Sequence, residues 1–321
     1  MTSLPSDRWR RWEAFFWLAP VVAYFALPGY RVLGAQIFIN GLFAVSLDLL
    51  MGYAGVVSLG HAAFFGAGAY TAGLLAVHGW AEPLSGLLAA AAVAAVLGFA
   101  TSFLVVRGQD LTRLVVTLGV GFLLYEAANR AAWLTGGVDG LTGIAMNKLL
   151  GLFPFDLGGR TSYWYSLLVT FALFALCKRI ASSPFGLSLR AIREGKARMP
   201  AIGAPVRRRL VAAFTLSAAL AGVAGALLAQ TTEFVGLEVF GFSRSGQALI
   251  MVVLGGVGRL YGGLVGAAVF LVMQDVLADI NPLYWQFWLG LMLVFVVLLA
   301  RGGILGGVDV MRQRWARRAA S

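Results

Sequence analysis

One stretch of the chain, residues 47–70, places flexible and polar residues inside an otherwise apolar sequence, LDLLMGYAGVVSLGHAAFFGAGAY. Gly52, Gly55 and Gly60 loosen the backbone where the surrounding hydrophobicity predicts membrane-spanning segments. Lipid cannot hydrogen-bond an exposed peptide group, so a helix that is broken at that depth must face protein or water. Broken membrane helices of this kind are typical of pathways for small polar solutes.

The side chains of this stretch could match the charges of such a solute. Tyr53 and Ser58 offer hydroxyl groups, His61 offers a titratable ring, and Asp48 places a carboxylate near the end of a predicted span. Each has a structural alternative: His61 could fix the loop by hydrogen bonds, and Asp48 could accept hydrogen bonds from backbone amides near the membrane interface. The glycines could equally serve close helix packing. The sequence leaves these alternatives open.

The same residues do not predict catalysis. The chain has two histidines, and His61 and His78 lie at opposite ends of one predicted helix, about 25 Å apart by helix rise. They cannot share a metal or serve one nucleophile. The sequence also lacks a glycine-rich phosphate-binding loop, so any ATP hydrolysis must come from another protein. We expect no metal, no cofactor and no enzymatic activity in this chain.

Composition predicts an all-α, polytopic membrane protein. Hydrophobic residues make up 60% of the 321 and charged residues 12%, against roughly 25% charged in soluble domains. We expect about ten spans, at least one of them broken or re-entrant. Together they form a transmembrane permease-like domain over 13–300. A basic N-terminus (1–12) precedes this domain and a basic C-terminal tail (301–321) follows it. The predicted spans are 13–30, 33–51, 61–77, 84–106, 112–134, 162–178, 209–230, 243–258, 260–278 and 284–300.

Basic residues predict the orientation, since short loops rich in lysine and arginine stay in the cytoplasm. With the N-terminus inside, ten crossings leave five of the 25 basic residues outside and the other 20 inside. The five are Arg31, Arg130, Lys148, Arg160 and Arg244. Both termini are therefore expected in the cytoplasm. The net charge of +11 is explained by topology, and because its charges are scattered over short loops it does not indicate nucleic-acid binding.

The longest predicted cytoplasmic loop, residues 179–208, contains a short amphipathic helix. Ser183 and Pro184 make a good helix start, and Phe185, Leu189 and Ile192 then recur at helical spacing. Its apolar face could enter a groove on a partner protein, or the helix could lie on the anionic inner leaflet. The pattern alone does not separate the two.

The predicted outer loop carries the motif TGGVDGL, residues 135–141, directly after a span. It could face the solute cavity, receive an extracytoplasmic partner or form an ordinary glycine turn. With the helix break it completes the set of candidate pathway residues, which are Asp48, Tyr53, Gly55, Ser58, Gly60, His61, Thr135, Gly136, Gly137 and Asp139.

Five motifs in order resemble the M-type permease subunit of branched-chain amino-acid ABC importers. They are LDLLMGYAGVVSLGHAAFFGAGAY (47–70), LTGGVDGL (134–141), SPFGLSLRAIRE (183–194), AALAGVAGALLAQ (218–230) and VVLGGVGRLYGGLVGAA (252–268). The resemblance implies a bacterial inner-membrane protein that works with a related second permease, two cytoplasmic ATPase subunits and a periplasmic solute-binding protein. It also implies that the cytoplasmic loop docks on the ATPase through Pro184, Phe185, Leu189, Arg190, Ile192, Arg193, Glu194 and Gly203.

The expected function is therefore ATP-driven import of a branched-chain amino acid or a similar small solute by alternating access. The alternatives are an ion-coupled carrier that acts alone and a passive channel. Transport in vesicles without ATP or a second protein would distinguish them from an importer subunit.

Overall fold

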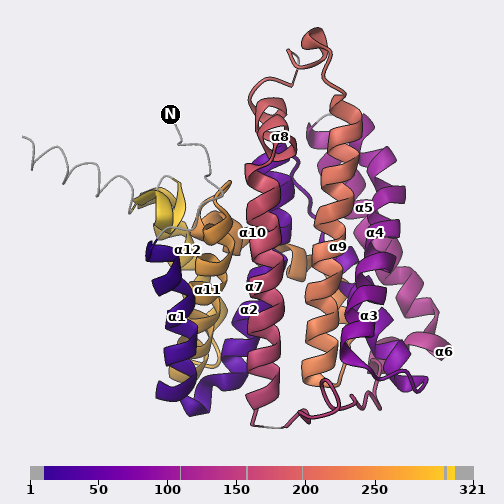
Figure 1. Ribbon diagram of the computed structural model, residues 1–321, viewed down its shortest axis with the longest axis vertical. Coiled ribbons are helices and arrows are strands. Elements are labelled where there is room, and N and C mark those ends of the chain that lie inside the picture. The colour runs from indigo at the N-terminus through magenta and orange to yellow at the C-terminus, as the bar shows by residue number, and fades with distance from the viewer. Residues whose placement is uncertain (1–10, 109, 157, 197, 300–301, 308–321) are drawn as a thin grey trace, which may run out of the picture.

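Regular structure is helical throughout the part of the chain that the computed structural model describes (Figure 1). That part comprises residues 11–108, 110–156, 158–196, 198–299 and 302–307. Within it, the only β-type pairings are isolated bridges that join Leu141 to Val235 and Leu149 to Phe153. The predicted all-α, multi-pass membrane fold is confirmed.

The longer helices run roughly along one axis of the molecule, and short helices fill the turns between them (Figure 1). In chain order the elements are α1 (Arg11–Ala26), η1 (Pro28–Tyr30), α2 (Arg31–Asp48), η2 (Leu49–Tyr53), α3 (Ala62–Val77), α4 (Pro83–Arg107), α5 (Asp110–Arg130), α6 (Ala132–Thr135), η3 (Gly137–Asp139), α7 (Arg160–Ser182), α8 (Pro184–Glu194), η4 (Pro200–Ile202), α9 (Val206–Thr232), η5 (Leu237–Phe240), α10 (Phe242–Gly255), α11 (Leu260–Ile280) and α12 (Trp285–Leu299).

Six segments of the described chain are helical, long and apolar enough to cross a bilayer. They are Pro28–Tyr53, Pro83–Arg107, Leu111–Arg130, Arg160–Ser182, Val206–Thr232 and Leu260–Ile280. The remaining helices of the ten predicted spans, α1, α3, α10 and α12, are shorter. The 14 residues of α10, for example, rise about 21 Å, less than the roughly 30 Å of the hydrocarbon core. Helix length alone therefore does not establish ten crossings.

The predicted interruption between the second and third spans is present. The chain leaves α2 as a π-helix over Leu49–Tyr53, and it is irregular from there until α3 begins at Ala62. We call residues 54–61 the first break. A π-helical turn shifts the hydrogen-bond register and is often found at functional sites in long helices.

A second break, which the sequence analysis did not predict, follows α9. After Thr232 the chain is irregular up to η5, and α10 begins at Phe242. We call residues 233–241 the second break. Its aromatic residue Phe240 packs against α3, where its ring stacks on Tyr70 with centroids 5.4 Å apart. The predicted span 243–258 is thus a helix too short to cross the hydrocarbon core alone, preceded by a segment that contains only the short helix η5.

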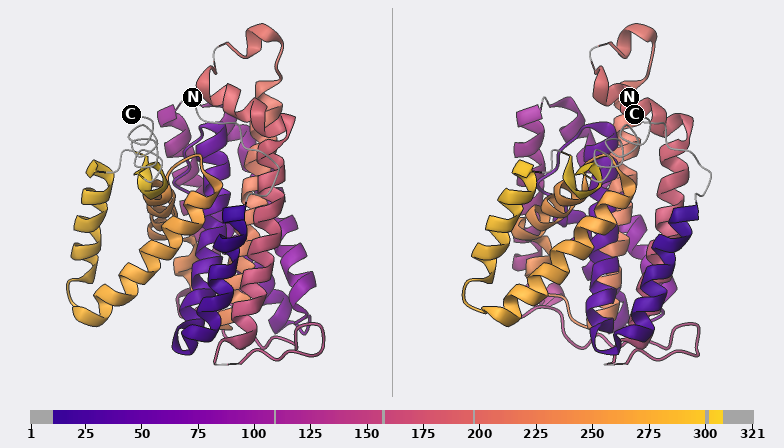
Figure 2. Two further views of the ribbon diagram at one scale, coloured as in Figure 1. Left: turned by 60° about the vertical axis from the view of Figure 1, so that its left-hand side comes forward. Right: turned by 90° about the vertical axis from the view of Figure 1, so that its left-hand side faces the viewer.

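The two broken units run in opposite directions and meet at their helix starts. α3 leads away from the α8 end of the molecule toward the start of α4, whereas α10 leads back toward the α8 end (Figures 1 and 2). The Ala62 amide, at the start of α3, donates to the Ser245 hydroxyl in the first turn of α10 over 2.9 Å. The order α9, α10, α11 thus repeats α2, α3, α4 with inverted direction, as in transporter folds built from inverted repeats.

Small residues allow the central helices to approach closely. α9 packs along both α3 and α4, and α2 packs along α11. Where α3 crosses α9, a Cβ atom at Gly68 would overlap the Gly222 carbonyl oxygen. Gly222 in turn lies against Ala90 and Ala94 of α4. Close backbone contact of this kind supplies the dispersion energy that holds membrane helices together, because burial from lipid supplies little.

Local sequence also fixes where helices begin. The Glu82 carboxylate accepts from the Ser85 amide over 2.7 Å and so caps α4, with Pro83 in the first turn. The hydrogen bonds from Ser85 lower the pKa of Glu82, because they favour the ionised carboxylate that accepts them. The predicted start of the helix in the loop 179–208 is confirmed, since the Ser183 hydroxyl accepts from the Gly186 amide at the start of α8.

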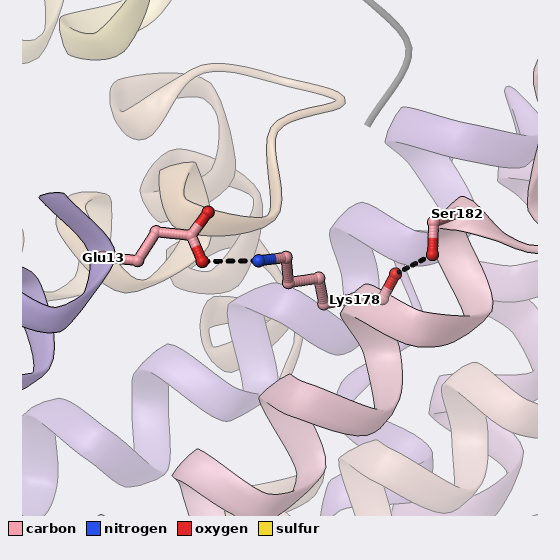
Figure 3. A network of polar contacts seen from close by, with 3 residues as sticks. All are labelled: Glu13, Lys178 and Ser182. Carbon is pink, nitrogen blue, oxygen red and sulfur yellow. Dashed lines mark hydrogen bonds and ion pairs between the residues drawn. The ribbon is translucent and has the colours of Figure 1, made fainter. Parts of the chain in front are cut away.

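An ion pair buried among the helices ties α1 to α7. The Lys178 ammonium donates to the Glu13 carboxylate, and the side chains are only 8% and 5% exposed (Figure 3). Ser182, one turn further along α7, donates to the Lys178 carbonyl over 3.0 Å. α7 leads directly into α8, so the pair also holds α1 beside the helix that carries α8.

Candidate functional site

The end of α2 is locked against the turn between α10 and α11. The Asp48 carboxylate Oδ1 accepts from the Gly258 amide over 2.7 Å, and Asp48 is fully buried. Gly258 has a φ of +80°, a conformation that a side chain would strain. Position 52 must also be a glycine for this contact to form, because a Cβ atom there would lie only 2.5 Å from the Gly258 nitrogen. Asp48 therefore joins the two inverted halves of the fold.

Helix α8 rests on this junction. The Arg193 guanidinium donates to the Gly52 carbonyl in the π-helical turn. Arg190, one turn earlier, places its guanidinium carbon 4.6 Å from the centre of the Tyr53 ring. Gly55, with a φ of +69°, lies against the aliphatic part of the Arg193 side chain. Candidate pathway residues and candidate coupling residues are thus in direct contact.

The end of the first break, at His61, is held by buried hydroxyl groups. His61 is fully buried, with its Nε2 3.0 Å from the Ser46 hydroxyl of α2, and its ring stacks on Phe43. The Ser217 hydroxyl of α9 donates to the Ser46 carbonyl over 2.5 Å. These contacts agree with the interpretation in which His61 fixes the loop by hydrogen bonds.

Backbone groups of the first break also have partners. The Leu59 amide donates to the Thr117 hydroxyl of α5 over 3.2 Å. Ser58 is fully buried in a narrow gap whose lining includes Thr101, Thr117 and Phe64. The irregular backbone around Ser58 and Gly60 is therefore surrounded by protein, as its peptide groups require, whereas Gly55 is exposed beside Arg193.

The candidate residues of the motif TGGVDGL lie at the opposite end of the molecule from α8 (Figure 1). The Thr135 hydroxyl donates to the Ala128 carbonyl over 2.6 Å and closes the end of α5. Gly136 and Gly137 have φ angles of 78° and 59°, and they make the turn that follows. Asp139 is exposed. The structure thus brings Asp48, Tyr53 and Gly55 together, but it separates them from this turn.

Neither predicted use of the apolar face of α8 describes the structure. Leu189 and Ile192 are 0% and 1% exposed, because this face packs against the chain's own α7, α9 and π-helical turn. It is not available to a partner's groove or to lipid. Pro184 and Glu194 are exposed instead, as is Gly203 at the end of η4. A protein that docks here meets these residues, whereas Phe185 is half-buried.

Several residues of the site were not singled out from the sequence. Ser46, Ser217 and Ser245 are isolated hydroxyls in apolar helices, and all three bind the first break or its neighbours. The signal was present, because a polar side chain inside a span needs a partner. At the other end, the Gln230 side-chain amide donates to the Pro83 carbonyl over 2.9 Å and its oxygen accepts from Tyr165 over 2.7 Å.

A glycine-to-alanine change at Gly60 tests whether the first break is as tightly enclosed as these contacts indicate. A Cβ atom at Gly60 would overlap the Thr117 carbonyl oxygen, which is backbone and cannot rotate away. We expect Gly60→Ala to reduce the free energy of unfolding by about 1–3 kcal/mol. Reaction of the single, buried Cys177 with a thiol-reactive dye during heating would report the loss.

The matched control is Gly119→Ala in α5, where a Cβ atom would meet no atom within 4 Å. Alanine favours helix by up to about 1 kcal/mol over glycine, so this variant should be as stable as the unmodified chain or more so. An unchanged melting temperature for Gly60→Ala would contradict the enclosed arrangement.

Comparison with known proteins agrees with this architecture. Residues 33–297 match the family described as branched-chain amino acid transport system, permease component. The chain is 31% identical over 291 residues to LivM of Escherichia coli (strain K12), a high-affinity branched-chain amino acid transport system permease protein, covering 82% of this chain and 67% of that protein. It is 24% identical to LivH of the same organism, covering 84% and 92%.

A permease for a different solute is also similar. The chain is 30% identical over 221 residues to LsrC of Klebsiella pneumoniae, an autoinducer 2 import system permease protein, covering 65% of this chain and 60% of that protein. No solved structure gives a significant match. The family match covers most of the chain, including both breaks and α8. The protein therefore belongs to the family of branched-chain amino-acid transport system permease components.

Proposed function

We propose that this permease imports a branched-chain amino acid or a similar small solute by alternating access, driven by ATP that partner subunits hydrolyse. The contact of Arg193 with Gly52 carries the proposal, because it links α8 directly to the helix break. A force applied to α8 then reaches the backbone of the π-helical turn without an intervening element. Related permeases named LivM and LivH, which are described as branched-chain amino acid transport permeases, support the substrate class.

The proposed partners follow from what this chain contains and lacks. Similarity to both LivM and LivH supports pairing with a second, related permease. Two cytoplasmic ATPase subunits would contact the exposed residues of the segment 179–208, Glu194 and Gly203 among them. A periplasmic solute-binding protein would deliver solute at the opposite end, where Asp139 is exposed.

The proposed topology has ten crossings in the bacterial inner membrane with both termini in the cytoplasm. The helices that would make these crossings, short ones included, alternate in direction along the chain, which supports it (Figures 1 and 2). The short helices α3 and α10 would each complete a crossing together with the break that precedes them, 54–61 and 233–241 respectively. α8 then lies on the cytoplasmic side, as the distribution of basic residues predicts.

The proposed mechanism uses the break as the moving part. ATP binding would draw the ATPase subunits together and shift α8, and Arg193 would transmit that shift to the turn at Gly52. The turn is also bound to the other inverted half through Asp48 and Gly258. A shift there would change how the two halves meet, and so which side of the membrane the solute pathway faces. Helix ends and unwound backbone can match the charges of a zwitterionic solute on the way.

Reconstitution tests the proposal against a stand-alone carrier and a passive channel. Purified chain alone, and chain assembled with its second permease, ATPases and binding protein, are placed in separate vesicles with labelled leucine, isoleucine and valine outside. Only the assembled complex should accumulate label, and only with ATP. Uptake by the isolated chain, whether driven by an ion gradient or simply downhill, would overturn it.

A further inference from the structure

A groove runs along the outer face of the molecule between α4 and α9, which lie side by side in Figure 1. Its volume is about 890 Å³, within the roughly 300–1,000 Å³ of ligand pockets. Alanines make part of its lining, so the two helices leave a channel, and Phe99 and Phe103 of α4 stand beside it, 50% and 38% exposed. The groove lies between two of the six segments that can cross a bilayer, so in a membrane it would lie at the depth of the lipid.

The chemistry of the groove changes sharply at the α8 end. Arg207 and Arg208 lie in the first turn of α9, both exposed, and both belong to the groove lining. The Arg207 guanidinium lies 6.0 Å from the ring of Phe103, at the point where the apolar channel ends. None of the residues that line the groove is acidic. The site therefore has a long apolar part and a cationic head.

An amphiphile with an anionic head and a long hydrocarbon chain matches both parts. Arginine pairs bind phosphate oxygens through paired donors, and basic pockets between membrane helices bind anionic lipid headgroups. One arginine on an exposed helix, with no apolar groove beside it, would bind an anionic lipid only weakly. Here two lie at the mouth of a channel whose lining is otherwise apolar apart from Thr215.

We propose that this groove binds an anionic phospholipid, with its phosphate on Arg207 and Arg208 and one acyl chain between α4 and α9. The bound lipid would link the start of α9 to α4. Because α9 follows directly on the loop 179–208, which carries α8 and η4, the bound lipid would stabilise the position of the end of that loop. The inference depends on the chain spanning a bilayer and not on which solute it carries.

Lipid binding by the full chain in detergent tests the proposal. After delipidation, phosphatidylglycerol or phosphatidylcholine is added back, and bound lipid is counted by native mass spectrometry. The unmodified chain should retain phosphatidylglycerol in preference to phosphatidylcholine. The double variant Arg207→Gln, Arg208→Gln should bind phosphatidylglycerol about 10- to 30-fold more weakly, because two cationic contacts are lost. Equal binding of the two lipids, or no loss in the double variant, would overturn the proposal.

Two further variants separate headgroup from groove. Arg179→Gln removes an exposed arginine near the same end of α7 and should leave lipid binding unchanged. Ala212→Trp keeps both arginines but fills the channel, and it should reduce phosphatidylglycerol binding as strongly as the double variant. Folding of each is checked by the reactivity of the buried Cys177. If a photoreactive residue at position 216 crosslinks in membranes to the second permease and not to phospholipid, the groove is a protein interface and the proposal fails.

Discussion

Lys178→Met is expected to destabilise the chain by about 3–5 kcal/mol, because it leaves the Glu13 carboxylate buried without its cation. Methionine has nearly the length of the lysine stem, so the change removes the charge with little loss of volume. The melting temperature in detergent, followed by the reaction of Cys177 with a thiol-reactive dye, measures the effect.

The double variant Glu13→Leu, Lys178→Met distinguishes a lost partner from lost packing. Replacing both members of a buried pair by apolar residues of similar volume is often neutral or stabilising, so it should recover most of the loss. Lys148→Met, in the exposed loop after η3, is the matched control and should change the melting temperature little. If the double variant is as unstable as Lys178→Met alone, the two side chains contribute to stability through packing, and the electrostatic explanation is wrong.

The first break could be predicted from sequence because its cause is local. Gly52, Gly55 and Gly60 interrupt an apolar run, and the end of the regular helix at Tyr53 follows from them. The start of α8 is local in the same sense, since Ser183 and Pro184 are sufficient to cap it. Where one short stretch determines the backbone, composition and spacing reveal it.

The second break could not be found in this way. Residues 233–241 contain Glu233 and Glu238 and look in sequence like an ordinary loop between two spans. Phe240 occupies its place because α3 offers Gly66 and Tyr70 to receive it. The position at which α10 begins likewise depends on the start of α3, through the hydrogen bond from the Ala62 amide to the Ser245 hydroxyl. Features that depend on a partner far along the chain leave little trace in a local pattern.

The same reason explains the error about the apolar face of α8. Amphipathic spacing shows that Leu189 and Ile192 must be buried, but it does not show against what. The chain itself provides the surface, through α7, α9 and the π-helical turn. The resemblance places Arg190 and Arg193 among the docking residues. In the structure both side chains also contact the π-helical turn at the end of α2. The contacts among Asp48, Tyr53, Gly55 and α8 therefore form a continuous cluster, and the motif TGGVDGL lies apart from this cluster, at the other end of the molecule.

Arg193→Ala should separate ATP hydrolysis from transport. The charged hydrogen bond to the Gly52 carbonyl would be lost, and hydrogen bonds to charged groups contribute about 1.5–3 kcal/mol. If that contact transmits the movement of α8, the solute imported per ATP hydrolysed should fall about 10- to 100-fold. Hydrolysis and assembly with the ATPases should persist, because Leu189 and Ile192 still hold α8 in place. Uptake of labelled leucine and release of phosphate, measured on the same vesicles of assembled complex, give the ratio.

Three further substitutions decide whether Arg193 acts through the break or through docking. Arg193→Lys keeps a cation that can donate one hydrogen bond and should restore part of the coupling. Arg190→Ala removes the weaker contact with the Tyr53 ring and should cost less than Arg193→Ala. Glu194→Lys reverses an exposed charge on the neighbouring residue and should weaken ATPase binding while the ratio of solute to ATP in the complexes that do form stays normal. If Arg193→Ala instead abolishes assembly and leaves that ratio intact, α8 is only a docking element, and the helix break must receive its signal from elsewhere.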